Sequence, residues 1–291
     1  MKSLCEEYVL THTVEEALGV LSARHGSARI VGGGSDLLLE IQQGRHPPVG
    51  TLVDVTMIDE MCALEIREES IFIGASTTLS RLVNSSLIKK HGQALVDAAE
   101  MMANPQVSNV ATIGGNVAHA LPAADGSIAL LALDAHVEVA NMNGRRIVPL
   151  QALFKGPGES TLDPGLDLLV GFYLPLSKKS EASAFARRIS PQGVSLAIVN
   201  TAIWLRREAE RIIKIRIAVG PSGIVPLRMV AAEKALIDQT LSPSALTRAL
   251  EELLNEAHFR TSLHRATAEY RRHLAGILLQ EAFAMAWQRA G

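Results

Sequence analysis

The feature that most constrains this chain is a pair of glycine-rich segments, each of which leads from extended sequence into helical sequence. The first reads Ile30-Val31-Gly32-Gly33-Gly34-Ser35-Asp36-Leu37, and the second reads Asn109-Val110-Ala111-Thr112-Ile113-Gly114-Gly115-Asn116. Because glycine has no β-carbon, backbone amides at such a turn can approach a ligand closely. The helix N-terminus after the first segment adds partial positive charge, which suits a phosphate.

Each segment also has a simpler interpretation. Three consecutive glycines fit a tight turn that needs positive φ, and the second segment fits a structural turn in which Asp125 caps the following helix. The glycines lack the Gly-x-Gly-x-x-Gly spacing of the Rossmann fingerprint. Two such segments in one chain favour a split pyrophosphate cradle, in which backbone amides rather than basic side chains neutralise the charge.

Composition narrows the range of functions further. The 291 residues are 48% hydrophobic, with 28 Lys and Arg against 30 Asp and Glu. This balance supports a sizeable core and gives no basic excess for nucleic-acid binding. Two cysteines, Cys5 and Cys62, are too few for a disulfide framework or a four-thiolate metal centre. The nine histidines are scattered, so no metal site is predicted.

No targeting segment is predicted. The first residues, Met1 to Glu7, carry acids where a signal peptide has its apolar stretch. The most apolar window, Ile128 to Ala140, is interrupted by polar residues and is shorter than the roughly 20 residues that span a bilayer. We therefore expect a cytoplasmic protein without a membrane span.

The pattern of elements predicts an N-terminal domain over residues 1–176 and a C-terminal domain over residues 177–291. The first domain divides into subdomains of about 1–55 and 56–176. A capping box at Thr13 and Glu16 predicts the start of its first helix. Further elements are expected as strands at 28–31, 51–55, 63–67, 70–74, 136–140 and 168–173, helices at 37–43, 79–102 and 127–133, and a loop at 103–115.

The C-terminal domain has a different order of elements. Three strands are expected in series at 184–189, 196–205 and 212–219, followed by helices that begin at Ser242-Pro243 and Ala266. Strands followed by helices predict an α+β domain, in which helices pack on one face of an antiparallel three-stranded sheet.

Two motifs resemble those of a known family. Gly33-Gly34-Ser35-Asp36-Leu37-Leu38 is similar to the Gly-Gly-Thr-Asp-Leu stretch in the flavoprotein subunits of molybdenum hydroxylases, such as xanthine, CO and nicotinate dehydrogenases. The segment from Asn104 to Asn116 resembles their Pro-Gln-Ile-Arg-Asn-x-Ala-Thr-Ile-Gly-Gly-Asn motif, and Pro122-Ala123-Ala124-Asp125 continues the match. The resemblance implies a two-subdomain FAD-binding domain of the vanillyl-alcohol-oxidase type, followed by a C-terminal α+β domain with a helical bundle.

The resemblance also implies roles for individual residues. Ile30 to Leu37 would hold the FAD diphosphate on one side, and Thr112 to Asn116 would hold it on the other. Asp125 would lie near the sugar or ribityl hydroxyls, and the apolar pair Leu168 and Leu169 would lie against the cofactor. Arg187 matches a position from which a cation approaches the flavin in this family. The alternative interpretation is that Arg187 lies on an exposed strand face and forms a surface ion pair.

The function implied is electron transfer within a larger enzyme. FAD would receive electrons from iron–sulfur centres and pass them to NAD+ or another acceptor, while the partners would be a molybdopterin-containing large subunit and a small 2Fe-2S subunit. A free-standing FAD oxidoreductase and a non-catalytic assembly subunit with a degenerate FAD site remain alternatives. Ser108, Pro191 and Ser195 depart from the family pattern.

Overall fold

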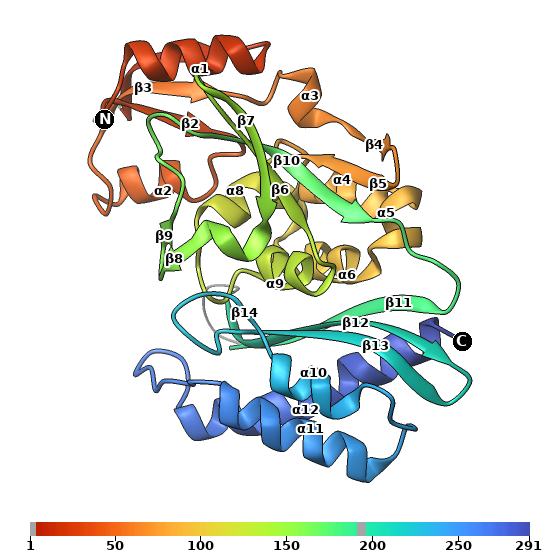
Figure 1. The fold of residues 1–291 in the computed structure, drawn as a ribbon. Coiled ribbons are helices and arrows are strands. Elements are labelled where there is room, and N and C mark those ends of the chain that lie inside the picture. The colour runs from red at the N-terminus through yellow and green to blue at the C-terminus, as the bar shows by residue number, and fades with distance from the viewer. Residues whose placement is uncertain (1–3, 191–195) are drawn as a thin grey trace.

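The computed structural model describes residues 4–190 and 196–291, and its three main sheets follow one another along the chain (Figure 1). The first sheet is parallel, with strand order β1-β3-β2, and α1 (Val14–Ala23) and α2 (Leu37–Gln42) belong to the same unit. Its strands are β1 (Cys5–Leu10), β2 (Ala28–Val31) and β3 (Val49–Asp54). Strand β1 was not predicted, because its largely exposed edge sequence lacks apolar alternation.

The predicted capping box at α1 forms with one difference. The Thr13 hydroxyl accepts the Glu16 amide at 3.0 Å, as expected. The Glu16 carboxylate accepts the amide of His12, at 2.8 Å, rather than that of Thr13. The helix start is therefore satisfied from both sides, one residue earlier than the usual pattern.

The second sheet is antiparallel, with strand order β4-β5-β10-β6-β7. Its strands are β4 (Leu64–Arg67), β5 (Ser70–Gly74), β6 (His136–Asn141), β7 (Gly144–Pro149) and β10 (Leu168–Pro175). A small hairpin of β8 (Phe154–Gly156) and β9 (Glu159–Ser160) follows a 3-10 turn at Leu150–Leu153. The helices of this part are α3 (Asp59–Cys62), α4 (Leu79–Asn84), α5 (Ser86–His91), α6 (Gln93–Met102), α7 (Pro105–Ser108), α8 (Ile113–Ala118) and α9 (Asp125–Ala132).

Three expectations for this region need correction. The helical stretch 79–102 is three helices, because the chain leaves helical geometry at Ser85 and Gly92. The expected loop 103–115 contains α7 and the start of α8. Helix α9 begins at Asp125, two residues before the predicted start, and its N-cap is Ala124, so Asp125 is not the capping residue.

The C-terminal domain contains the three predicted strands and a short fourth one. They are β11 (Glu181–Ile189), β12 (Ala197–Glu208), β13 (Arg211–Gly220) and β14 (Leu227–Arg228), in that order across the sheet. Helices α10 (Val230–Leu236), α11 (Pro243–Glu256) and α12 (Ala268–Arg289) follow. The expected three-stranded sheet is thus four-stranded, because the two-residue β14 is too short to give a sequence pattern.

Helices cover both faces of this sheet, whereas one covered face was expected (Figure 1). Phe185, Ala202 and Ala218 stand side by side on β11, β12 and β13 and pack into the core of the N-terminal domain. Ala184 and Ile203, on the opposite face, pack in a second core with α10 to α12. The burial of both faces follows from the two-residue period of a strand.

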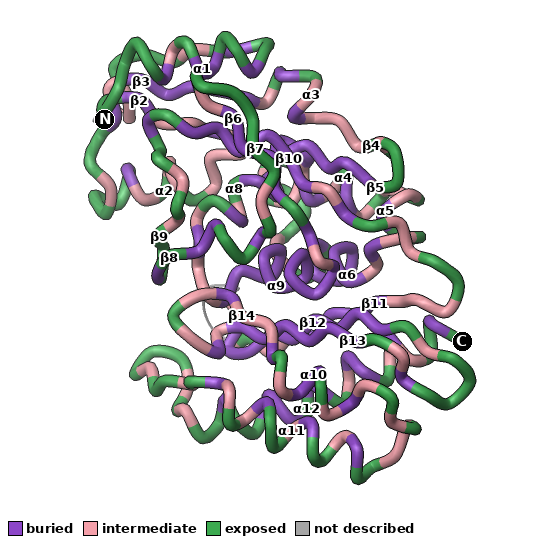
Figure 2. The backbone as a smooth tube through the Cα atoms, viewed as in Figure 1, coloured by how far each residue is buried: buried purple, intermediate pink, exposed green. Residues whose placement is uncertain are grey.

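Helix α9 lies in the buried layer between the two antiparallel sheets (Figure 2). All residues from Asp125 to Ala132 are buried. A helix surrounded by protein on every side needs no polar stripe, which explains why this window is so apolar. Among the described residues, no helix is long and apolar enough to cross a membrane.

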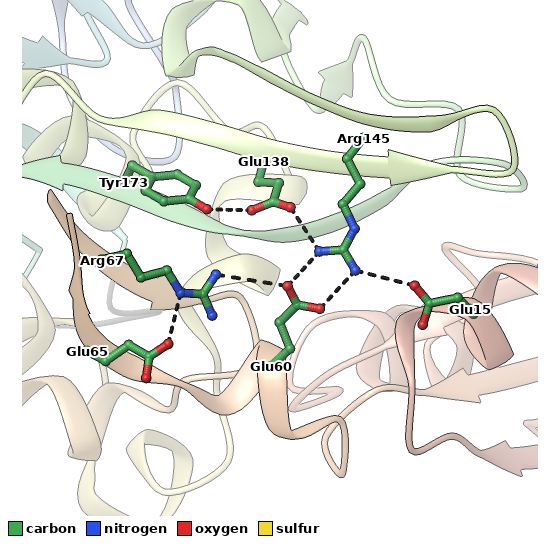
Figure 3. Close-up of polar contacts among 7 residues, drawn as sticks. All are labelled: Glu15, Glu60, Glu65, Arg67, Glu138, Arg145 and Tyr173. Atoms are coloured by element: carbon green, nitrogen blue, oxygen red, sulfur yellow. Dashed lines mark hydrogen bonds and ion pairs between the residues drawn. The ribbon is translucent and has the colours of Figure 1, made fainter.

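A polar network ties the first helix to the second sheet (Figure 3). Arg145 on β7 donates to both carboxylate oxygens of Glu60 at 2.6 and 3.0 Å, and to Glu138 at 3.0 Å. It also reaches Glu15 on α1 at 3.4 Å. Tyr173 on β10 donates to Glu138 at 2.9 Å. One guanidinium therefore serves three acids that are far apart in the sequence.

We predict that Arg145→Gln lowers the free energy of unfolding by about 1–3 kcal/mol, because the buried Glu138 loses its cation. The hydrogen bond from Arg145 lowers the pKa of Glu60, so the contribution of that carboxylate is present above the ordinary glutamate pKa of about 4.3. The contribution is lost as the pH falls through the folded-state pKa. Urea denaturation at pH 7 and in acid measures both effects.

Arg206→Gln is the matched control, because Arg206 pairs with the exposed Glu208. Such a surface pair contributes roughly 0–1 kcal/mol. Equal stability of Arg145→Gln and the wild-type protein at pH 7 would contradict a stabilising role for the network.

Candidate functional site

The two glycine-rich segments lie directly against each other. A β-carbon on Gly33 would be 1.9 Å from the carbonyl oxygen of Val110, and one on Gly32 would be 2.9 Å from the hydroxyl oxygen of Thr112. Gly34 has φ +68, a conformation that glycine adopts at little cost. Part of the glycine requirement is therefore structural: the segments need glycine in order to approach each other.

A cavity of about 1180 Å³ opens where the segments meet. It is bounded by both segments, the start of α9, the first residues of β10 and the β8–β9 hairpin. The structure brings most of the predicted site residues to this cavity. They are Ile30, Val31, Gly32, Gly33, Gly34, Ser35, Asp36, Leu37, Thr112, Gly114, Gly115, Asn116, Asp125, Leu168 and Leu169.

The first segment presents unused backbone donors to the cavity. Within the described part of the chain, the amides of Gly32, Gly33, Gly34, Ser35 and Asp36 donate to no protein acceptor. Such a run of amides is suited to the oxygens of a diphosphate. Since α2 spans six residues, the individual amides, rather than a long helix dipole, supply the positive potential.

The second segment differs, because most of its amides donate within the protein, and among the described residues only the amide of Thr112 in this segment has no acceptor. Ile113 donates to the Thr77 carbonyl at 3.0 Å and Gly114 donates to the Ala75 carbonyl at 2.8 Å. Gly115 donates to the Thr112 hydroxyl at 3.1 Å. Asn116 and the two glycines of this segment line the cavity. The Oδ1 of Asn116 is buried near Gly126 and has no hydrogen-bond partner among the described residues.

Two residues of the predicted set do not line the cavity. Ile113 is fully buried in the core. Arg187 on β11 forms a buried ion pair with Asp125, and each side chain is 6% exposed. Arg187 is therefore neither an exposed residue nor a direct neighbour of the cavity, and Asp125 lies between the two.

One side of the cavity is apolar. Leu168 and Leu169 at the start of β10 are 1% and 6% exposed. Met61 and Leu79 contribute further apolar surface. A large planar ring system can pack on such a surface, while the amides of the first segment bind its charged end.

Several basic residues that line the cavity were not predicted from the sequence. Arg29 on β2, His46 after α2 and Lys155 on β8 line the cavity. Arg29 immediately precedes the first motif, so its place on a strand leading to the site was the available signal. Lys155 had none, because the hairpin that carries it has no motif.

Of the three residues that differ from the family motifs, one lies in the described structure. Ser108 lies on α7, where its hydroxyl donates to the Pro105 carbonyl at 3.1 Å. Pro191 and Ser195 lie outside the described residues.

The fold and the cavity define a two-domain protein with a site for a large cofactor that carries phosphate. Residues 4–177 match the family described as the FAD binding domain in molybdopterin dehydrogenase, and residues 186–286 match the CO dehydrogenase flavoprotein C-terminal domain. The chain belongs to the FAD-binding flavoprotein subunits of the molybdenum hydroxylases, and its cofactor is FAD.

Individual relatives agree over nearly the whole chain. The chain is 28% identical to a xanthine dehydrogenase FAD-binding subunit of Escherichia coli over 281 residues, which cover 96% of this chain and 95% of that protein. It is 31% identical to the 6-hydroxypseudooxynicotine dehydrogenase complex subunit alpha of Paenarthrobacter nicotinovorans, with coverage of 100% and 97%. A carbon monoxide dehydrogenase structure from Hydrogenophaga pseudoflava matches with TM-score 0.93 and 27% identity, covering 100% of both chains.

We predict that Gly115→Val removes most of the bound flavin without unfolding the protein. A β-carbon on Gly115 meets only the Thr112 hydroxyl, at 3.2 Å, so the larger side chain extends into the cavity. The flavin-to-protein absorbance ratio and the unfolding midpoint measure the two effects separately.

Gly114→Val is the comparison variant. A β-carbon on Gly114 would lie 2.6 Å from the Ala75 carbonyl oxygen, so this variant loses stability through a clash within the protein. Full flavin content in a folded Gly115→Val protein would show that the cofactor does not approach this segment.

We predict a pH-dependent contribution from His119 on the cavity wall. Its ring nitrogens lie 3.8 Å from Asp36 and 3.5 Å from Glu40, so it joins the end of α8 to α2. The nearby carboxylate of Asp36 raises the pKa of His119. The stabilisation is therefore complete below the ordinary histidine pKa of about 6.5 and is lost as the pH rises through the folded-state value.

His119→Gln should cost about 0.5–1 kcal/mol near pH 6 and nothing near pH 9. Chemical denaturation of the wild-type and variant proteins at both pH values measures this. The exposed His264 provides the control substitution, His264→Gln. A destabilisation that is the same at both pH values would contradict the ion-pair explanation.

Proposed function

We propose that the first glycine-rich segment binds the FAD diphosphate through its backbone amides. This assignment rests on the five amides that donate to no protein acceptor in residues 4–190 and 196–291. Ile30 to Leu37 form this side of the site, and Thr112 to Asn116 close the other side. Leu168 and Leu169 support the flavin ring. Asp125 accepts hydrogen bonds from ribityl or sugar hydroxyls.

We also propose that the boundary between the two domains lies between residues 176 and 177.

We propose further that the chain carries electrons within a multi-subunit enzyme. Its relatives include a subunit of a xanthine dehydrogenase and one of a 6-hydroxypseudooxynicotine dehydrogenase complex. The chain has two cysteines, so iron–sulfur clusters must be held elsewhere. The proposed partners are a molybdopterin-containing large subunit, where substrate is oxidised, and a small 2Fe-2S subunit.

Bound FAD would accept electrons singly and deliver them as a pair to NAD+ or to another acceptor. The roles of the chain are to bind the flavin, to orient it and to set the electrostatic field around it. No residue of this chain is proposed to act on the organic substrate.

The complete enzyme tests this function. The tagged chain should co-purify with a molybdenum-containing large subunit and an iron–sulfur subunit, and substrate should reduce the flavin in that assembly. Purified chain alone should not oxidise the substrate. Turnover by the chain alone would favour a free-standing oxidoreductase, whereas an assembly without flavin would favour the structural role.

The identity of the electron acceptor can be determined with the same purified complex. Complex assembled with Gly115→Val should retain molybdenum and iron but should lose reduction of NAD+, if NAD+ is the acceptor. Comparing NAD+ with an artificial electron acceptor separates loss at the flavin from loss at the molybdenum centre.

We predict that the flavin released by denaturation is FAD and not FMN. The residues of the first segment line the cavity, and five of their amides donate to no acceptor among the described residues, an arrangement suited to a diphosphate, which FMN lacks. Chromatography of the released flavin against both standards measures this. Recovery of FMN would contradict the assignment of these amides to a diphosphate.

A further inference from the structure

Asp125 is a cavity residue whose carboxylate is held entirely from the C-terminal domain. It stands at the first position of α9 and is 5% exposed. Its Oδ1 accepts a hydrogen bond from Asn200 Nδ2 at 2.5 Å, and its Oδ2 pairs with Arg187. Each oxygen can accept one further hydrogen bond, and Asp125 lines the cavity.

The orientation of the Asn200 amide follows from its contacts. Nδ2 donates both to Asp125 and to the carbonyl of Ala123, at 3.1 Å, so both of its protons are used on one short stretch of chain. Asn200 is fully buried on β12, and its Oδ1 has no partner. A flipped amide would place that oxygen against the carboxylate, so this arrangement admits a single orientation.

Arg187 completes the arrangement from the neighbouring strand. Arg187 and Asn200 stand opposite each other on β11 and β12, on the face that packs against the N-terminal domain. Arg187 also donates to the carbonyl of Met101 at the end of α6. The guanidinium is therefore fixed by two elements of the N-terminal domain as well as by its own strand.

We propose that Asn200 and Arg187 are positioning residues, through which the C-terminal domain holds the Asp125 carboxylate toward the hydroxyls of FAD and thereby sets FAD affinity. This inference rests on the proposed role of Asp125 at the FAD hydroxyls. It gives the C-terminal sheet a part in cofactor binding, although neither positioning residue lines the cavity.

The burial of Asp125 explains why such support is needed. Removal from water disfavours the charged form and raises the pKa of Asp125, while Arg187 and Asn200 oppose that effect. The charged group that faces Asp125 is Arg187 on β11, and Asn200 on β12 is the neutral donor. Without the Asn200 donor, the carboxylate is both less fixed and less stable in its charged form.

The test is a double-mutant cycle on FAD binding. The dissociation constant of FAD is measured by flavin fluorescence on the flavin-free full chain for wild type, Asn200→Ala, Asp125→Ala and the double variant. Asn200→Ala should weaken binding roughly tenfold, the effect expected for a lost hydrogen bond to a charged group. In the Asp125→Ala background, the same change should have less than a twofold effect, because the two residues act through one contact.

Thr201→Val is the matched control. Thr201 is the next residue on β12, is fully buried and has an unpartnered hydroxyl, and its side chain points to the opposite face. This variant should bind FAD as the wild type does. Unfolding midpoints are recorded for every variant, and Asn200→Ser replaces Asn200→Ala if the latter does not fold.

The outcomes separate this inference from the proposed function. Unchanged FAD affinity in a folded Asn200 variant, or losses that multiply in the double variant, would overturn the positioning role. Wild-type affinity in Asp125→Ala would overturn the assignment of Asp125 on which the inference rests. Failure of the wild-type chain to bind FAD would instead contradict the proposed function itself.

Discussion

Two buried carboxylates determine how the C-terminal sheet sits on the N-terminal domain. Asp97 on α6 pairs with Arg289 at the end of α12, at 2.6 and 3.2 Å, and Asp125 on α9 pairs with Arg187 on β11. Removing the partner of a buried charge commonly destabilises a protein by about 3–5 kcal/mol. Separating either ion pair would therefore be strongly unfavourable. The relative placement of the domains is therefore fixed by specific polar contacts as well as by apolar packing.

Between these contacts, the packing of the sheet follows from strand periodicity. Phe185 faces the N-terminal core, and its neighbour Ala184 faces the helices of the C-terminal domain. The same alternation turns Asn200 toward α9 and Thr201 away from it. Because both faces of the sheet are buried, the sheet contacts helices on each side. Helix α9, which begins at the cavity, is one of these helices.

Elements that have a local sequence pattern could be predicted, whereas contacts between residues far apart in the sequence could not. Strand β5 (Ser70–Gly74) and the start of α11 after Ser242 were found because alternation and caps act over a few residues. Strand β1 was missed because its largely exposed sequence lacks apolar alternation, so nothing local marked it as a strand. The Asp125–Arg187 pair was missed because the two residues are 62 positions apart. Both motifs led to the cavity, but neither indicated which amides were already used.

The two glycine-rich segments show why a motif does not define its own chemistry. Gly33 and Gly114 are required by contacts within the protein, with Val110 and Ala75, whereas a side chain on Gly115 would meet the cavity. Among the described residues, most of the amides without a protein acceptor belong to the first segment, so a cradle that looked symmetric in the sequence is asymmetric in the structure. One segment carries most of the unused amides, and the other carries the surface against which that segment packs. Its own amides are used to hold that surface on Ala75 and Thr77, which is why it can keep the first segment in place.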